Sequence, residues 1–515
     1  IIKSLDLVEQ FSTFSGLRLN KEKTEAMWLG PWADSSETLG GLKWNCRVKC
    51  LGVFFSSTLS ASEIVDNWNK KLCKMKKVLA SWASRNLSLL GKILVLKSLI
   101  ASQLSYMLSV LVPPEKFLND VNSMFYRFLW KKDRVKRNVL IQDYSVGGLK
   151  MPDIKIIHKT FLLKWVKKLL HQTDNAYAPI WKKIQLSYLH RFGPNVCIFR
   201  CNCNMAQLQP CSYIQSLPDF YKKLIQTWYE VKEINTIDDV SEENMPWQLL
   251  WNNVCVTYKG KMLYFRNWVK KNILFINDII DCYGNLMSLS ELKSIVGDHP
   301  SLLFQYNALR NAIPSKWIGF PHSKSEAPAI KLLGKEAYLQ SNTFFKNILV
   351  SQKAVVPTGQ SFWEKRLKQF DFQVVTWKSI WKSLFCITTE PKIRSLQWKV
   401  LHNVYPTRVK LYKQGITDTD KCPSCNSVDY VEHFLYECKC VKPLWAHIEK
   451  LYLINYGTSL SLDLHHVIVG YKLDNLVKFQ HINMLILIGK LTISKYKYGK
   501  YVGTITSLFE QECVL

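Results

Sequence analysis

Four potential metal ligands lie close together toward the C-terminal end of the chain, at Cys422, Cys425, His433 and Cys438. Two residues separate the first two cysteines, seven lie between Cys425 and His433, and four lie between His433 and Cys438. Three thiolates and one imidazole form a complete tetrahedral set for Zn²⁺ and leave no position for a substrate. The spacing therefore predicts a structural zinc site, which constrains how this part of the chain folds.

Short-range patterns predict how the backbone brings these ligands together. The two residues at 423–424, Pro and Ser, allow the tight turn that lets both thiolates of the Cys-x-x-Cys pair face one ion. Residues 432–437 have the pattern of a short helix, which places His433 and Cys438 on nearly the same face. Cys440 is an alternative to Cys438 as the last ligand, and the sequence leaves that choice open.

The chain is strongly basic. It contains 69 Lys and Arg against 40 Asp and Glu, which gives a net charge of +29. Such an excess predicts a polyanionic partner, with nucleic acid as the first candidate and an anionic membrane as the second. No lipidation motif or long basic amphipathic helix supports the membrane, and the most apolar run, 482–489, is too short to span a bilayer. We therefore expect nucleic-acid partners and no membrane.

Length and cysteine usage bound the architecture and the compartment. A chain of 515 residues is too long for one ordinary core, so about two to four domains are expected. The 15 cysteines are odd in number and mostly scattered, which favours a reducing compartment over secretion. The chain begins Ile1-Ile2-Lys3, without an initiator Met and inside an apparent helix, and this predicts a piece of a longer protein.

Hydrophobic periodicity predicts a mainly helical chain with a small mixed segment at its start. Residues 4–14 have helical spacing, and short strands are expected at 17–20, 25–30 and 48–55, the last bent at Gly52. Further helices are expected from Ser62 to Trp82 and at 88–112, 115–130, 154–170, 289–296, 392–402, 409–414 and about 477–496.

Several motifs resemble one family of polymerases. Residues 14–25 (FSGLRLNKEKTE) resemble the segment that follows the catalytic aspartates in reverse transcriptases of non-LTR retrotransposons, the long interspersed element class. Residues 50–56 (CLGVFFS) resemble the primer-grip hairpin of the same palm, and residues 85–98 resemble its thumb. The passage 392–445, which contains the Cys-His cluster, resembles the zinc-binding domain found after reverse transcriptase in these elements.

The resemblance implies a mainly α fold in five parts. We expect a small residual α+β palm fragment, a helical thumb, a helical linker domain and a C-terminal helical zinc-binding domain. Their expected boundaries are 1–60 for the partial palm, 61–170 for the thumb-like domain, 171–320 for the linker domain, 321–361 for a linker, and 362–515 for the zinc-binding domain.

The resemblance also implies that the polymerase aspartates are missing. Nucleotidyl transfer needs two Mg²⁺ ions held by carboxylates, and the family's Ala-Asp-Asp strand would fall before Ile1. The only adjacent aspartate pair, Asp238-Asp239, lies in a polar acidic stretch that we interpret as a solvated turn. The expected protein is a fragment of an RNA-directed DNA polymerase that binds template RNA and primer DNA, with no catalytic residue of its own. Mg²⁺ is expected only in the complete parent enzyme.

The same resemblance implies partners and a location. Element RNA, target-site DNA and a missing N-terminal polymerase and endonuclease portion are the expected partners, in a nuclear and cytoplasmic ribonucleoprotein. Two alternatives stay open from the sequence. One is a non-enzymatic, zinc-containing nucleic-acid-binding protein, and the other is a zinc-stabilised adaptor for protein interactions.

Basic and turn residues at several positions are candidates for contacting nucleic acid. The densest basic run is 131–137, in which five of seven residues are cationic. For each lysine and arginine the alternative is an ordinary solvated side chain. The predicted contact residues are Lys21, Lys23, Leu51, Gly52, Arg85, Lys92, Lys97, Lys131, Lys132, Arg134, Lys136 and Arg137.

Overall fold

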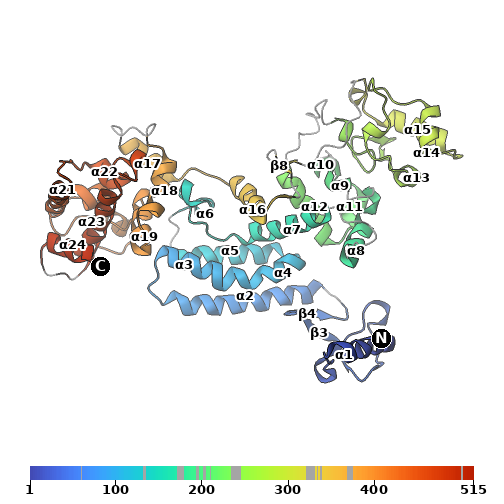
Figure 1. Ribbon diagram of the computed structural model, residues 1–515, viewed down its shortest axis with the longest axis horizontal. Helices are drawn as coiled ribbons and strands as arrows, with labels where there is room; N and C mark the ends of the chain where they lie inside the picture. Colours follow the sequence, from blue (N-terminus) through green and yellow to red (C-terminus); the bar gives the residue numbers. More distant parts are fainter. Residues whose placement is uncertain are drawn as a thin grey trace. The chain divides into compact units, whose positions relative to one another are not determined.

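The computed structural model forms two compact units, and neither is a continuous stretch of chain. Unit 1 contains Ile1–Met107, Pro113–Ile154 and Lys353–Leu515, and unit 2 contains Leu108–Val112 and Lys155–Gln352. The mainly helical fold is confirmed (Figure 1). The five-part linear division stays a prediction. The structure describes residues 1–58, 61–130, 135–170, 179–192, 197–200, 205–208, 210–232, 245–319, 331–332, 335–336, 339–367, 375–499, 501 and 503–514.

The N-terminal segment has one helix and two very small sheets. Helix α1 (Ile2–Ser15) ends at Gly16, whose φ of 70° gives the left-handed cap, and the helix buries none of its residues. The strand expected at 17–20 is not formed, and the strand expected at 25–30 is cut to two residues. Such short strands find only one partner each among the described residues, and isolated pairs are marginal in water. The remaining elements are η1 (Lys21–Lys23), β1 (Glu25–Ala26), η2 (Gly30–Trp32), β2 (Lys43–Trp44), β3 (Arg47–Cys50) and β4 (Val53–Ser56).

The hairpin β3–β4 forms where the sequence predicts it. Its strands are antiparallel, with Arg47 opposite Ser56 and Cys50 opposite Val53. The connecting turn is Leu51-Gly52, and both residues have positive φ, of 48° and 86°. Two positive φ values in a two-residue loop are the geometry that matches the twist of paired strands. Leu51 is 76% exposed, so the turn presents an apolar side chain to solvent.

Three helical segments lie side by side in the part that resembles a thumb (Figure 1). Their bounds are Ala61–Ala83 for α2, Leu89–Val110 for the middle segment and Glu115–Leu129 for α5. Trp68 of α2 is fully buried and its ring lies 4.7 Å from that of Phe117. The middle segment is not one regular helix, because a π-type turn and a 3-10 turn interrupt it. Its pieces are α3 (Leu89–Val95), η3 (Leu96–Ile100), η4 (Ala101–Leu104) and α4 (Ser105–Val110).

The same middle segment, Leu89–Val110, is the one described helix that is long and apolar enough to cross a membrane. Its 22 residues have a mean hydropathy of 1.6, and 44% of the apolar window is buried inside the protein. A helix that packs into a protein core passes the same test of length and composition. This segment packs against α5, as a helix in a protein core does.

Unit 2 is built from short helices and two small hairpins. Its helices α7 (Ile154–Leu170) and α14 (Leu289–Val296) have the predicted bounds, and α14 opens with a capping box of Ser288 and Glu291. The other elements are α8 (Ile180–Leu189), η7 (His190–Phe192), α9 (Cys197–Arg200), α10 (Met205–Leu208), α11 (Ser212–Ser216), α12 (Asp219–Val231), η9 (Met245–Trp247), β5 (Thr257–Tyr258), β6 (Lys261–Met262), α13 (Arg266–Lys270), η10 (Ile276–Asp278), α15 (Leu302–Ala312), η11 (Ser315–Trp317), β7 (Lys331–Leu332), β8 (Lys335–Glu336) and α16 (Asn342–Ser351).

The C-terminal helices complete unit 1. They include the predicted helix at 392–402, which spans Pro391–Leu401 as α19, and the predicted final helix, which spans Gln480–Tyr498 as α23. One more helix, α24, follows α23. The elements of unit 1 that follow α5 are α6 (Arg137–Leu140), η5 (Tyr144–Val146), α17 (Thr358–Arg366), α18 (Trp377–Ile387), α19, α20 (Arg408–Lys413), η13 (His433–Glu437), α21 (Lys442–Tyr456), α22 (Leu464–Val469), η14 (Leu473–Asn475), α23 and α24 (Ile505–Val514).

A loop that follows α6 is held by the C-terminal helices of the same unit. The carbonyl oxygen of Gly147 accepts hydrogen bonds from Nε1 of Trp398, at 2.9 Å, and from Nε2 of His402, at 2.8 Å. Both side chains are buried, and burial lowers the pKa of His402 to about 4. His402 is thus a neutral hydrogen-bonding residue. The ring of Trp398 also lies 6.2 Å from that of Trp130.

Lys490, in the middle of α23, is fully buried. Its Nζ donates to Oε1 of Gln397 at 2.6 Å and to the carbonyl of Ile468 at 3.3 Å. No carboxylate is paired with it among the described residues. Burial lowers its pKa from 10.5 to about 7, because a charged amine is poorly solvated there.

Replacing Lys490 by Met is expected to change how stability depends on pH. Between about pH 7 and pH 10.5 the unfolded state binds more protons than the folded state, so the stability of the wild-type protein rises with pH in that window. The variant lacks this contribution, so its stability relative to wild type is greatest near pH 6 to 7 and declines toward pH 10. Urea unfolding at several pH values measures the difference. The exposed Lys478→Met is the control, and equal pH profiles for the two variants would contradict the expectation.

Candidate metal centre

The first two cysteines of the cluster lie on a tight loop. The N–H of Cys422 donates to the carbonyl of Ser427 at 2.8 Å, and the N–H of Asn426 donates to the carbonyl of Cys422 at 2.9 Å. Asn426 has a φ of 58°, a conformation that asparagine tolerates better than most residues. The loop closes as a miniature hairpin, with a bridge between Lys421 and Val428. Its curvature turns both thiols to the same side.

His433 and Cys438 lie at the two ends of a π-type turn, η13. The N–H of Cys438 donates to the carbonyl of His433 at 3.1 Å, which closes a ring over five residues. In a regular α-helix two residues five apart point about 140° away from each other. The wider turn brings them onto the same face. The sequence predicts a short helix here, and the structure shows that its π form is what makes the spacing work.

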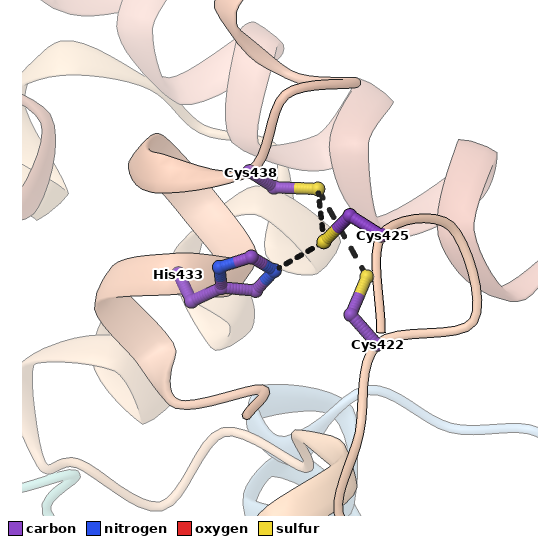
Figure 2. Close-up of side chains that lie close together, drawn as sticks. All are labelled: Cys422, Cys425, His433 and Cys438. Atoms are coloured by element: carbon purple, nitrogen blue, oxygen red, sulfur yellow. Dashed lines mark hydrogen bonds between the residues drawn. The ribbon is translucent and has the colours of Figure 1, made fainter. Parts of the chain in front are cut away.

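Figure 2 shows the four side chains converging. The Sγ of Cys425 lies 3.2 Å from Nε2 of His433 and 3.8 Å from Sγ of Cys438, and the Sγ atoms of Cys422 and Cys438 are 3.9 Å apart. All four ligand atoms lie within 4.8 Å of one another. Two thiolates bound to one tetrahedral Zn²⁺ are separated by about 3.8 Å, given Zn–S bonds of about 2.3 Å. The donor set and its spacing therefore fit zinc.

The group that converges contains Cys438 and not Cys440. Sulfur–sulfur distances near 3.8 Å are far longer than a disulfide bond, and all these cysteines are free thiols. Cys422, His433 and Cys438 are buried, and Cys425 is half-buried. A site so enclosed, with four protein ligands, has no open position for a reacting molecule.

The side chains behind the cluster form a dense apolar support. Phe434 and Leu435, inside the π-type turn, are fully buried. Nε1 of Trp445 donates to the carbonyl of Leu435 at 2.8 Å, which fixes the turn against the start of α21. Local packing of this kind orients the ligands before an ion binds.

A buried ion pair that the sequence pattern does not reveal lies beside the cluster. Nζ of Lys497, near the end of α23, is 3.9 Å from Sγ of Cys422 and 3.8 Å from Oδ1 of Asp429. The side chains of Lys497 and Asp429 are 3% and 2% exposed. Three thiolates and one Zn²⁺ carry a net charge of −1, so the ammonium offsets it. Lys497 is 75 residues from Cys422, and no spacing rule connects the two.

Burial and this ammonium shape the protonation of the ligands in the metal-free state. Burial raises the pKa of the Cys438 thiol to about 12. Burial lowers the pKa of His433, and the charge on Lys497 adds to that shift, so the imidazole is neutral near pH 7. A neutral imidazole is ready to bind a metal, whereas the thiol must release its proton when the metal enters.

A second group of potential ligands lies at the start of α22. It consists of Asp463, His465 and His466. The Nε2 atoms of the two histidines are 3.0 Å apart, and Nδ1 of His466 accepts from the N–H of Asp463 at 3.1 Å. These ring nitrogens already bind each other and the backbone, so the group is explained as a helix cap.

The predicted nucleic-acid contacts lie on separate elements. Lys21 and Lys23 are exposed on η1, and Leu51-Gly52 is the exposed turn of β3–β4. Arg85 follows α2 and lies over the ring of Trp82 at 4.2 Å. Their contact with nucleic acid stays a prediction.

The remaining candidates differ in exposure. Lys92 is half-buried, with Nζ 3.4 Å from the carbonyl of Leu129, and Lys97 is half-buried in η3. Lys136 is exposed and Arg137 half-buried at the start of α6. The other three, Lys131, Lys132 and Arg134, lie outside the described residues.

Comparisons with known proteins agree with the site. Residues 358–445 match the family described as zinc-binding in reverse transcriptase, and this range includes the whole Cys-His cluster. A curated relative, the uncharacterized 149 kDa protein of transposon TX1 from Xenopus laevis, is 23% identical over 546 residues. The alignment covers 95% of this chain and 40% of the relative, so the chain spans less than half of that protein's length. The chain therefore carries a zinc-binding segment of the kind found in reverse transcriptases, and it is related along 95% of its length to a transposon protein.

Proposed function

We propose that this chain is the nucleic-acid-binding part of an RNA-directed DNA polymerase of a non-LTR retrotransposon, and that it lacks the catalytic aspartates. The observation that carries the proposal is the zinc-binding match within a chain that aligns along 95% of its length with a transposon protein. Element RNA and target-site DNA are the proposed partners, together with an N-terminal polymerase and endonuclease portion. The proposed setting is a nuclear and cytoplasmic ribonucleoprotein.

Zn²⁺ in this proposal is structural and is held by Cys422, Cys425, His433 and Cys438. Bound there, the ion supplies a cross-link and no reaction chemistry, because the protein fills its ligand positions. The residues around the ion determine which segments the cross-link joins. The loop at 422–427 becomes fixed to the π-type turn, and Lys497 keeps α23 against the same cluster. Basic helices on both sides of the cluster are thereby held in one arrangement.

Binding to RNA is expected to depend steeply on salt. The net charge of +29 supports several phosphate contacts, and each contact to a single strand contributes about −0.7 to the slope of log K against log[salt]. For about four or more contacts the slope is about −3 or steeper. Fluorescence anisotropy with a labelled single-stranded RNA, at about 50 to 200 mM salt, measures it. A protein-interaction adaptor has no such affinity, so absence of RNA binding throughout the titration would contradict the proposal.

Purified chain 1–515 is expected to show no primer extension. No aspartate pair in its sequence stands in the position that the polymerase palm requires, and two-metal transfer depends on such carboxylates. The assay contains an RNA template annealed to a DNA primer, Mg²⁺ and deoxynucleotides. Binding of the same template–primer, measured in parallel, separates lack of chemistry from lack of binding. Extended primer from the purified chain would refute this part of the proposal.

A further inference from the structure

A cavity of about 660 Å³ lies beside the end of α5 and the start of α6. Seven described residues line it. Three belong to α5, two directly precede α6 and two begin α6. In that order they are Ser123, Tyr126, Arg127, Val135, Lys136, Arg137 and Asn138. All come from unit 1, so the cavity is complete within one compact unit. It plays no part in the metal centre described above.

The lining is rich in positive charge and donors. Arg127, Lys136 and Arg137 are cationic, and none of the described lining residues is acidic. No salt bridge joins any of these three cations to a carboxylate among the described residues. Like charges around one cavity repel each other, and an anion inside it removes that cost.

Structural roles explain only one of the three cations. Arg127 lies in the last turn of α5, where a positive side chain stabilises the helix end. Lys136 and Arg137 stand at the beginning of α6, where the helix dipole gives a cation no such advantage. Two of the cations are therefore left without a structural explanation.

We propose that this cavity binds the phosphodiester backbone of nucleic acid, with Arg127, Lys136 and Arg137 as the phosphate-binding groups. The volume lies within the range of sites that hold whole ligands, about 300 to 1,000 Å³, and far exceeds what a single inorganic phosphate fills. A stretch of backbone supplies both the size and successive negative charges. Guanidinium groups bind phosphate oxygens in bidentate fashion, and Ser123 and Asn138 add neutral donors to the cavity lining.

The inference rests on the proposed nucleic-acid-binding function and locates one of its contact surfaces. It is tested on the full zinc-loaded chain with a labelled oligo(U) RNA of about 16 nucleotides. The test variant is Arg127→Gln/Lys136→Gln/Arg137→Gln. The matched control, Lys316→Gln/Lys442→Gln/Lys450→Gln, removes three exposed positive charges that are not part of the cavity lining. A third variant, Arg127→Lys/Lys136→Arg/Arg137→Lys, preserves the charge. Thermal unfolding of each confirms that it is folded.

The test variant is expected to bind at least about tenfold more weakly at 0.15 M salt, with a salt slope shallower by about 2, because about three phosphate contacts are lost. The charge-removing control changes affinity by less than about twofold, and the charge-preserving variant keeps the wild-type slope. Equal losses in the test variant and the control would overturn the inference, because the effect is then general electrostatics. Effective competition by polyglutamate at equal charge would also overturn it, since the site would then not select phosphate.

The wild-type protein and the test variant together separate the role of the cavity from nucleic-acid binding in general. If wild-type protein does not bind the RNA at any salt concentration, the nucleic-acid-binding function itself is wrong. If wild-type protein binds and the test variant binds equally well, the function stands and the cavity is not a contact surface. Cross-linking with 4-thiouridine RNA gives a second readout, with a cross-link expected at Tyr126 on the cavity wall.

Discussion

Replacing Cys425 by Ser, or removing zinc with a chelator, is expected to unfold the segment around the metal centre. Structural zinc contributes on the order of 10–16 kcal/mol of binding free energy in small zinc modules, which is comparable to or larger than the whole stability of an ordinary domain. The loop at 422–427 is held by one β-bridge and a few backbone hydrogen bonds, so its conformation depends on the zinc cross-link. Without the ion, the buried thiols of Cys422 and Cys438 lose the metal that holds their sulfur atoms together.

Zinc content and amide hydrogen exchange measure this result. One zinc per chain is expected in the wild-type protein and in the controls Cys440→Ser and Cys386→Ser, since neither cysteine belongs to the converging group. Cys425→Ser is expected to lose most of its zinc and to lose exchange protection at 414–445, whereas α2 and α5 keep theirs. Full zinc stoichiometry in Cys425→Ser would show that the ligand assignment is wrong.

Replacing Trp398 by Ala is expected to destabilise unit 1 by about 3–5 kcal/mol, the usual cost of deleting a buried aromatic side chain. The indole is 1% exposed, contacts the rings of Trp130 and His402, and donates to the carbonyl of Gly147. Its loss leaves a cavity between α19 and the loop after α6. His402 still donates to Gly147, so the carbonyl keeps one hydrogen bond.

Two further variants separate the contributions in the Trp398 experiment. Trp398→Phe keeps most of the ring but removes the N–H donor, and it is expected to cost less than the alanine variant, with about 1 kcal/mol of that cost arising from the hydrogen bond. Trp32→Ala removes an indole that is 63% exposed, so it is expected to change stability by about 0.5 kcal/mol or less. Denaturant unfolding gives the free energies. If Trp398→Ala and Trp32→Ala lowered the free energy of unfolding equally, the buried contacts of Trp398 would not be what stabilises unit 1.

Much of the local structure follows from nearby residues. The ligand set of the metal centre is contained within 422–438, and the residue types alone indicate zinc. The capping box at Ser288, the turn at Leu51-Gly52 and the bounds of α7 are likewise short-range, because each depends on hydrogen bonds or periodicity over a few residues. The resemblance to reverse transcriptases comes from such local motifs, and the comparisons support it.

Other features were decided only by tertiary contacts. The strand expected at 17–20 is absent because an extended segment needs a partner to satisfy its backbone, and none pairs with it among the described residues. The pairing of Lys497 with Asp429 and Cys422 joins residues far apart in sequence. So does the contact of Trp398 with Gly147, which spans 251 residues.

The metal centre itself combines both kinds of information. The order of residues shows which side chains are available and that they suit zinc, because ligand chemistry depends on the residue type. The tertiary structure decided that the segment before Cys438 adopts a π-type turn, that Cys440 lies outside the group, and that a lysine from α23 stands beside the thiols. These outcomes depend on how α21 and α23 pack around the turn, and long-range packing energies are not encoded in any short pattern.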